Sequence, residues 1–240
     1  MGSNELYQYS IVSALMDGVA SQGPSISEIL ARGNHGLGTF RHLVGELIVL
    51  DGQAYQMKSD GSVTAIEASV AGTVSPFAMI TKFEPTTTIN AVLAGKDDLF
   101  NLLTMLLPQA HNHYMAMRIS GTFKAVTVRT VGGQRVPHEG LAEVGEHQTS
   151  HTFTESMRGT IIGFRSPAYM QGISVAGDHL HFISEDKKRG GHVLAFATDT
   201  EVEVAAAPIS SIHLDLPKDD IEFNEASLKG DSEGISAVEG

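Results

Sequence analysis

Three histidines at strand spacing constrain the fold of this chain more than any other feature of its sequence. His179 and His181 lie two residues apart, and His192 follows a short charged segment and two glycines. Alternate side chains of a β-strand share a face, so a strand here puts His179 and His181 on one side of a sheet. Leu180 and Phe182 then point to the opposite face, into the core. The segment is therefore predicted to form a β-hairpin.

The return strand of this hairpin brings the third histidine to the first two. If His192 lies opposite His181, their Cβ atoms are about 5 Å apart. Three imidazole nitrogens about 2.0–2.1 Å from one metal ion are then within reach, and Gly190 and Gly191 let the backbone turn tightly before the third histidine. The chain has no cysteine, which excludes thiolate ligands. The pattern therefore predicts a metal site. Zinc is the commonest ion at a three-histidine site, where it keeps open coordination positions. The pattern alone does not indicate which reaction is catalysed.

Other histidines give weaker metal-binding patterns. His111 and His113 form a second pair two residues apart, for which helix-end capping and strand packing are the better interpretation. His147, His151 and Glu155 could share one helical face, but the polar residues between them are poor helix formers. A solvated loop is favoured there.

Two alternative functions remain open at the level of local pattern. Glu185 follows His181 by four residues and superficially completes a cupin-like ligand set, typical of metal-dependent oxygenases and isomerases. It also lies in a charged turn, where a solvated carboxylate is the simpler interpretation. The other alternative is a non-catalytic protein with structural zinc, which requires four protein ligands and no open position.

Turn signals and apolar periodicity predict an α+β fold with mixed or antiparallel sheets and a few helices. Helices are expected over 6–19, over 25–31 with a capping box from Ser25 and Glu28, and over 87–107 with a break near Gly95. Strands are expected over 46–50, 53–57, 76–83, 113–119, 123–129, 160–164, 173–183, 192–198, 202–206 and 209–214.

The sequence Gly-Thr-Phe occurs at 38–40 and again at 121–123. The chain is expected to form one unit of 1–240. The short repeat is compatible with two related β-rich halves within it, about 1–155 and 156–240, packed closely together.

Charge and hydropathy limit the partners of the chain. Sixteen basic against 28 acidic residues leave a formal charge of −12, which disfavours a nucleic-acid-binding surface. No secretory signal and no run of 18 apolar residues is evident, so the expectation is a soluble cytoplasmic protein without membrane association.

Several blocks in the same order resemble the acetolactate decarboxylase family along nearly the whole chain. They are 36–40 (GLGTF), 45–52 (GELIVLDG), 75–77 (SPF), 121–123 (GTF), 128–131 (VRTV), 159–167 and 179–192. The resemblance implies an enzyme, a homodimer, that converts the small molecule 2-acetolactate to (R)-acetoin and CO2. It also implies that Zn²⁺ is held by His179, His181 and His192.

The same resemblance assigns further site residues. The family's active-site glutamate falls on Glu46, its arginine on Arg129 and a substrate-side threonine on Thr39. A second glutamate, in a Val-Glu pair near the carboxyl terminus, falls on Glu239. The chain departs from the family pattern at 43–46, which is LVGE rather than LDGE, and after Val131, where Gly-Gly replaces Pro-Lys. Neither departure removes a functional group.

Overall fold

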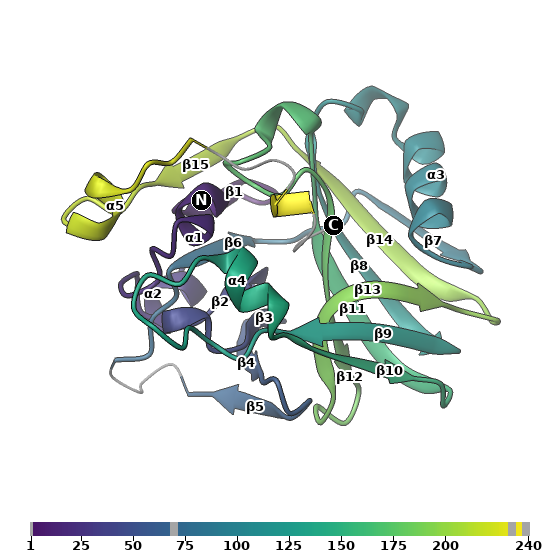
Figure 1. Ribbon diagram of the computed structural model, residues 1–240. Coiled ribbons are helices and arrows are strands. Elements are labelled where there is room, and N and C mark those ends of the chain that lie inside the picture. Colours follow the sequence, from purple (N-terminus) through teal and green to yellow (C-terminus); the bar gives the residue numbers. More distant parts are fainter. Residues whose placement is uncertain (1, 68–71, 230–233, 237–240) are drawn as a thin grey trace.

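Two facing β-sheets form the framework of the molecule (Figure 1). The computed structural model describes residues 2–67, 72–229 and 234–236. The seven-stranded sheet has the order β15-β1-β6-β2-β3-β4-β5. Its strands are β1 Leu6–Tyr9, β2 His35–Thr39, β3 Glu46–Leu50, β4 Gln53–Met57, β5 Val63–Ile66, β6 Phe77–Thr81 and β15 Ile212–Asp215. Only the pairing of β1 with β15 is parallel among these strands.

The eight-stranded sheet is antiparallel and has the order β10-β9-β13-β12-β11-β8-β14-β7. Its strands are β7 Thr87–Ala91, β8 Tyr114–Phe123, β9 Ala125–Thr130, β10 Thr149–Phe153, β11 Met157–Ser166, β12 Gly177–Ser184, β13 Gly190–Ala197 and β14 Val202–Ile209. The helices are α1 Val12–Met16, α2 Ile26–Leu30, α3 Lys96–Leu106, α4 Leu141–Glu146 and α5 Ile221–Glu225. The predicted α+β class is confirmed.

The inner faces of the two sheets pack against each other. On β3, Ile48 and Leu50 contact Ile162 and Ile183 of the eight-stranded sheet. The alternate β3 residues, such as Leu47, point to the outer face and pack beneath α2. This alternation is what period-two apolar strands produce when both faces are covered. The space between the sheets is therefore the place where side chains from β2, β3 and β12 can meet.

The long helix α3 covers the other face of the eight-stranded sheet (Figure 1). Leu99 and Leu103 of α3 are buried in one cluster with Leu180 and Phe182 of β12. The prediction that β12 has two different faces is confirmed. Its apolar side chains face this core, while its histidines face the other sheet.

The sheets divide the chain differently from the halves suggested by the short repeat. Strands β1 to β6 with β15 form one sheet, and β7 to β14 form the other. Since β10 and β11 belong to the same sheet, residue 155 does not separate two structural halves.

Two predicted helices are wrong at their amino-terminal ends. The segment 6–19 forms β1 followed by the short α1, because Leu6 to Tyr9 pair with both β6 and β15. The segment 87–107 begins as β7, whose threonines and isoleucine pair with β14, and becomes helical only after Gly95. In both cases strand pairing overrides a local apolar spacing that suits a helix. The break expected between the strands 113–119 and 123–129 is also misplaced, because β8 runs without interruption from Tyr114 to Phe123.

The capping box at Ser25 is confirmed. The Ser25 hydroxyl accepts from the backbone of Glu28, and the Glu28 carboxylate accepts from the backbone N–H of Ser25 at 2.8 Å. Strands over 46–50 and 53–57 are confirmed with the same bounds. No helix in the described ranges is long and apolar enough to cross a bilayer.

A buried histidine on β2 makes stability depend on pH. His35 is 2% exposed, and its ring stacks on Phe83 with ring centroids 4.6 Å apart. Burial, helped by the charge of Arg118, lowers the pKa of His35 from 6.5 to about 4. The folded chain thus holds this imidazole neutral, while the unfolded chain protonates it below about pH 6.5. The resulting stability is fully present above pH 6.5 and is lost as pH falls towards 4.

We expect His35→Leu to remove part of this pH dependence. Between pH 7 and pH 5 the parent should lose about 2 kcal/mol more free energy of unfolding than the variant, since each unit of pKa shift corresponds to about 1.4 kcal/mol. Urea unfolding at the two pH values measures the difference. His113→Leu, at an exposed position, is the control and should behave as the parent. Equal pH dependence in the parent and His35→Leu would contradict the prediction.

Candidate active site

The three histidines of the predicted hairpin form one buried cluster. His181 of β12 and His192 of β13 are directly opposed in the strand register, as predicted. One ring nitrogen from each of His179, His181 and His192 lies within 4.8 Å of the others. The three residues are 5%, 0% and 2% exposed, so the cluster lies inside the protein. A Cβ on Gly190 would lie 2.6 Å from the carbonyl oxygen of Phe182, so glycine permits the close strand approach before His192.

A contact between the sheets fixes the orientation of the central ring. Nδ1 of His181 lies 2.8 Å from the carbonyl oxygen of Leu47 on β3. A carbonyl can only accept, so Nδ1 carries the proton and Nε2 keeps its lone pair. This Nε2 is buried and makes no hydrogen bond within the described chain. A backbone carbonyl behind a ligating imidazole is the usual arrangement at metal centres.

All three imidazoles are held in the neutral form. Burial lowers the pKa of His181 to about 4 and the pKa values of His179 and His192 well below 6.5. Neighbouring rings and the charge of Arg129 add to the effect. A neutral imidazole is the form that binds a metal ion.

The residues present therefore fit a divalent metal ion. Three neutral imidazole nitrogens converge, and one of them, Nε2 of His181, is a buried acceptor with no hydrogen-bond partner among the described residues. Three histidine ligands with further positions open for substrate are typical of catalytic zinc. Within the described residues the cluster contains three such groups and not the four of a closed structural site.

Arg129 lies beside the histidine cluster on the same face of the eight-stranded sheet. It stands on β9 directly opposite His192, so both side chains leave the same face. The residue is 5% exposed, and its Nη2 has no hydrogen-bond partner in the part of the chain that is described. A buried guanidinium with donors to spare suits recognition of a carboxylate.

Glu46 reaches the cluster from the opposite sheet. Its Oε2 is 3.8 Å from Nε2 of His181, and its side chain is 13% exposed. Thr39 of β2 is the cross-strand partner of Glu46 and is 5% exposed. The Thr39 hydroxyl donates to the carbonyl of Gly45 at 2.9 Å, which fixes the backbone just before the glutamate.

A small cavity adjoins these side chains. Glu46, Thr39 and His179 line it together with Gly38, Phe77 and a set of aliphatic residues. We call this set the aliphatic wall; its members are Val12, Leu15, Leu43, Val131, Leu141 and Val175. The sequence gives no signal for this role, because the wall is assembled from α1, α4 and loops that are distant along the chain.

The remaining predicted ligands do not join the cluster. Glu185 is 65% exposed and pairs with Arg158 at 3.2 Å, so the cupin-like ligand set is wrong. His151 lies on β10 with Nε2 3.1 Å from the carbonyl of Ser59, and the loop expected there is largely strand. Glu239 lies outside the described residues.

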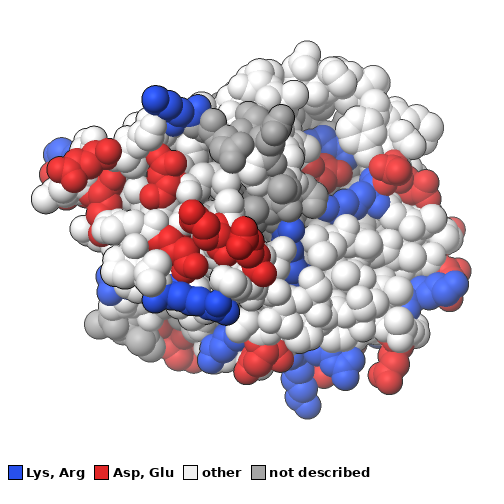
Figure 2. Space-filling model, in the orientation of Figure 1, with Lys and Arg blue, Asp and Glu red and all other residues white. Residues whose placement is uncertain are grey.

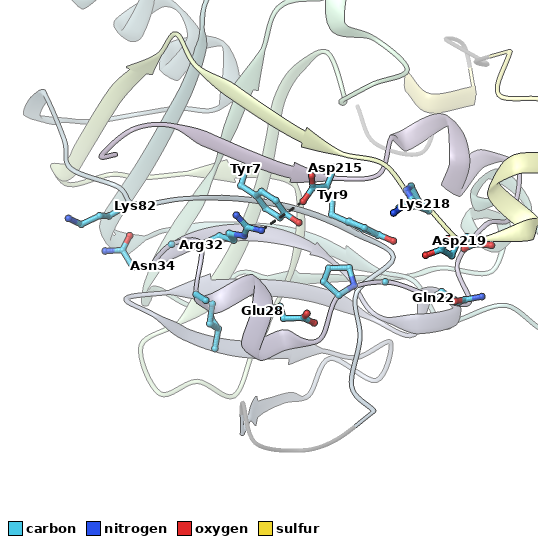
Figure 3. A pocket seen from close by; sticks show the side chains of 17 residues that line it. Tyr7, Tyr9, Gln22, Glu28, Arg32, Asn34, Lys82, Asp215, Lys218 and Asp219 are labelled. Atoms are coloured by element: carbon cyan, nitrogen blue, oxygen red, sulfur yellow. Dashed lines mark ion pairs between the residues drawn. The ribbon is translucent and has the colours of Figure 1, made fainter. Parts of the chain in front are cut away.

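A much larger groove in the described part of the chain lies away from the histidine cluster. It has a volume of about 1000 Å³ and opens between β1, the region of α2 and the chain after β15 (Figure 3). The Arg32 guanidinium lies 4.5 Å from the Tyr7 ring centroid and 3.9 Å from Asp215. These charged groups partner one another, and none of the histidine cluster lines the groove. A candidate active site chosen by cavity volume alone would therefore be this groove and not the histidine cluster.

The surface around the site carries an excess of negative charge. Acidic side chains gather over the region of α4, which includes Glu143 and Glu146 (Figure 2). An anionic ligand is therefore not attracted by the net charge of −12. Its recognition depends on local positive charge, which Arg129 supplies beside the histidines.

The fold and the cluster together define a class: a two-sheet α+β protein with a buried cluster of three histidines, suited to a metal ion, between its sheets. The sequence pattern of the family described as "Alpha-acetolactate decarboxylase" matches residues 6–230. The chain belongs to the alpha-acetolactate decarboxylase family.

Individual relatives agree with this assignment. The alpha-acetolactate decarboxylase of Bacillus subtilis (strain 168) is 38% identical over 223 residues, covering 92% of this chain and 85% of the relative. That of Klebsiella aerogenes is 36% identical over 225 residues, covering 93% and 84%. A crystal structure of the B. subtilis enzyme superposes with a TM-score of 0.91 at 37% identity, covering 98% of this chain and 99% of that one.

Proposed function

We propose that the protein is a zinc-dependent carboxy-lyase that converts 2-acetolactate to (R)-acetoin and CO2. The observation that carries this function is the buried three-histidine cluster with Glu46 and Arg129 beside it, in a chain of the decarboxylase family. His179, His181 and His192 would hold the ion. Zinc, when bound, supplies a Lewis acid for the keto and hydroxyl oxygens of the substrate, an effect worth several kcal/mol.

The chemistry requires stabilised negative charge and then a proton. 2-Acetolactate (2-hydroxy-2-methyl-3-oxobutanoate) is a β-keto acid. When the bond between its carboxyl carbon and C2 breaks, CO2 leaves and the electron pair forms an enediolate. Arg129 binds the substrate carboxylate and balances the charge that develops next to it. Its buried position removes competing water, which strengthens the interaction.

Glu46 completes the reaction by giving a proton to C2. A carboxyl on one side of the enediolate delivers the proton to one face, which gives a single enantiomer of acetoin, and it regains its proton from solvent. Thr39 holds the backbone before Glu46 through its hydrogen bond to Gly45. Glu239 stays a sequence-based candidate for the same proton transfer. The homodimer and the cytoplasmic location likewise stay predictions.

Removal of the metal tests this function directly. Purified protein with 2-acetolactate should form acetoin, and a chelator should remove most of that rate until Zn²⁺ is added back. Acetoin measured by colorimetric assay, with metal content measured on the same samples, provides the readout. Full activity in samples shown to be metal-free would reject the metal-dependent mechanism. Chelation that unfolds a protein with no activity in either state would support structural zinc instead.

A further inference from the structure

The lining of the cavity beside Glu46 contains few polar side chains. Glu46, Thr39 and His179 supply its polar side chains, and Phe77, Gly38 and the aliphatic wall make up the rest of its described lining. Substrate oxygens have partners at the histidine cluster and Arg129. The alkyl substituents of the substrate make no polar interaction with these groups. They are stabilised by contact with apolar surface instead.

The cavity bounded by the wall is small. The volume of the whole cavity is about 20 Å³, close to the roughly 10–15 Å³ that one water-sized probe occupies. A methyl group fits such a space, while a longer alkyl group must displace the wall. The size of the wall's side chains therefore bears directly on which substituents are accepted.

Val175 occupies a rigid part of this wall, four residues before His179. Its neighbour Ser174 donates to Oε1 of Gln8 at 2.6 Å and is 2.8 Å from the Tyr114 hydroxyl, and Nε2 of Gln8 donates to the carbonyl of Ile173 at 2.8 Å. Ser174, Gln8 and Tyr114 are all buried.

The same loop is also fastened to α1, which carries Val12 and Leu15 of the wall. The backbone N–H of Val12 donates to Ile173, and the backbone N–H and hydroxyl of Ser13 both donate to Gly172. A close-packed and hydrogen-bonded loop cannot yield easily to a larger ligand.

We propose that the aliphatic wall, in which Val175 is held by the hydrogen-bonded loop beside it, sets the size limit for an alkyl substituent of the substrate. This inference rests on the proposed function, because it concerns selectivity within that reaction. Val175 acts as a specificity determinant that contacts the unreactive part of the substrate.

The test compares Val175→Ala with Val144→Ala. Both valines are 2% exposed and belong to the same apolar cluster, but only Val175 lines the cavity. Each variant and the parent are assayed with 2-acetolactate and with two homologues, one bearing ethyl in place of methyl on C2 and one bearing ethyl on the acyl carbon.

Val175→Ala should raise kcat/KM for one homologue relative to 2-acetolactate at least about tenfold over the parent ratio, since one methylene in an apolar pocket discriminates roughly 10- to 200-fold. Val144→Ala should leave the ratio unchanged. Unchanged ratios in Val175→Ala, or equal changes in both variants, would overturn the proposal. Val175→Ile, which fills the space, should lower the ratio and provides the test if the alanine variant does not fold. A parent without activity on 2-acetolactate would instead reject the proposed function.

Discussion

Replacing His181 should abolish metal binding and decarboxylation together. His181 is fully buried at the centre of the cluster, and its Nε2 is the acceptor that would ligate the ion. Losing a metal centre that contributes several kcal/mol to the transition state should lower kcat/KM at least about a thousandfold. Metal content per chain and the initial rate of acetoin formation measure the two effects on the same sample.

Two substitutions at this position separate ligation from folding. His181→Ala removes the ligand and also the donor to the carbonyl of Leu47. His181→Asn keeps an N–H donor close to the position of Nδ1 but offers no nitrogen acceptor to a metal. We expect both to lose metal and activity, with His181→Asn retaining more of the parent's thermal stability. His111→Ala, at an exposed position, is the control; a His181→Asn protein with full metal content would contradict the assigned role.

The histidine hairpin can be predicted from sequence because its determinants are local. Period-two spacing sets the shared face of His179 and His181, and a charged turn followed by glycines sets the return of the chain to His192. The register of His181 with His192 agrees with that reasoning. Local pattern therefore suffices to predict that the three histidines cluster.

The rest of the site depends on how the two sheets face each other. Glu46 and the carbonyl of Leu47 approach His181 across a sequence separation of more than 130 residues, and no local pattern encodes that contact. Glu46 and Arg129 were identifiable only by family resemblance. No sequence pattern indicates that Val175 lines the cavity, because its position there depends on a buried hydrogen-bond network through Ser174 and Gln8.

The same distinction explains the errors in secondary structure. Apolar spacing at 6–19 suits a helix, and β1 forms because two neighbouring strands pair with it. At 87–107 the interruption near Gly95 is correctly predicted, but the residues before it pair with β14 and form β7. The first parts of both segments become strands because they pair with strands that are distant in sequence.

Glu46→Gln should slow turnover strongly while leaving the metal in place. Glutamine keeps the shape of the side chain beside the cavity, but it cannot give up and regain a proton at neutral pH. Because general acid–base catalysis is worth about 10²–10⁴-fold, kcat should fall within that range. Glu185→Gln is the matched control: it lies next to the same hairpin, its carboxylate is 65% exposed, and its turnover should equal that of the parent.

The stereochemistry of the product distinguishes proton transfer from a positioning role of Glu46. If Glu46 protonates one face of the enediolate, residual turnover of Glu46→Gln relies on water, and the excess of (R)-acetoin should fall. A residue that only positions His181, whose Nε2 lies 3.8 Å away, would lower metal content and leave the enantiomer ratio unchanged. Chiral chromatography of the acetoin and metal analysis give both readouts. Unchanged turnover in Glu46→Gln, with a large loss in Glu239→Gln, would transfer the proton step to the second carboxyl group.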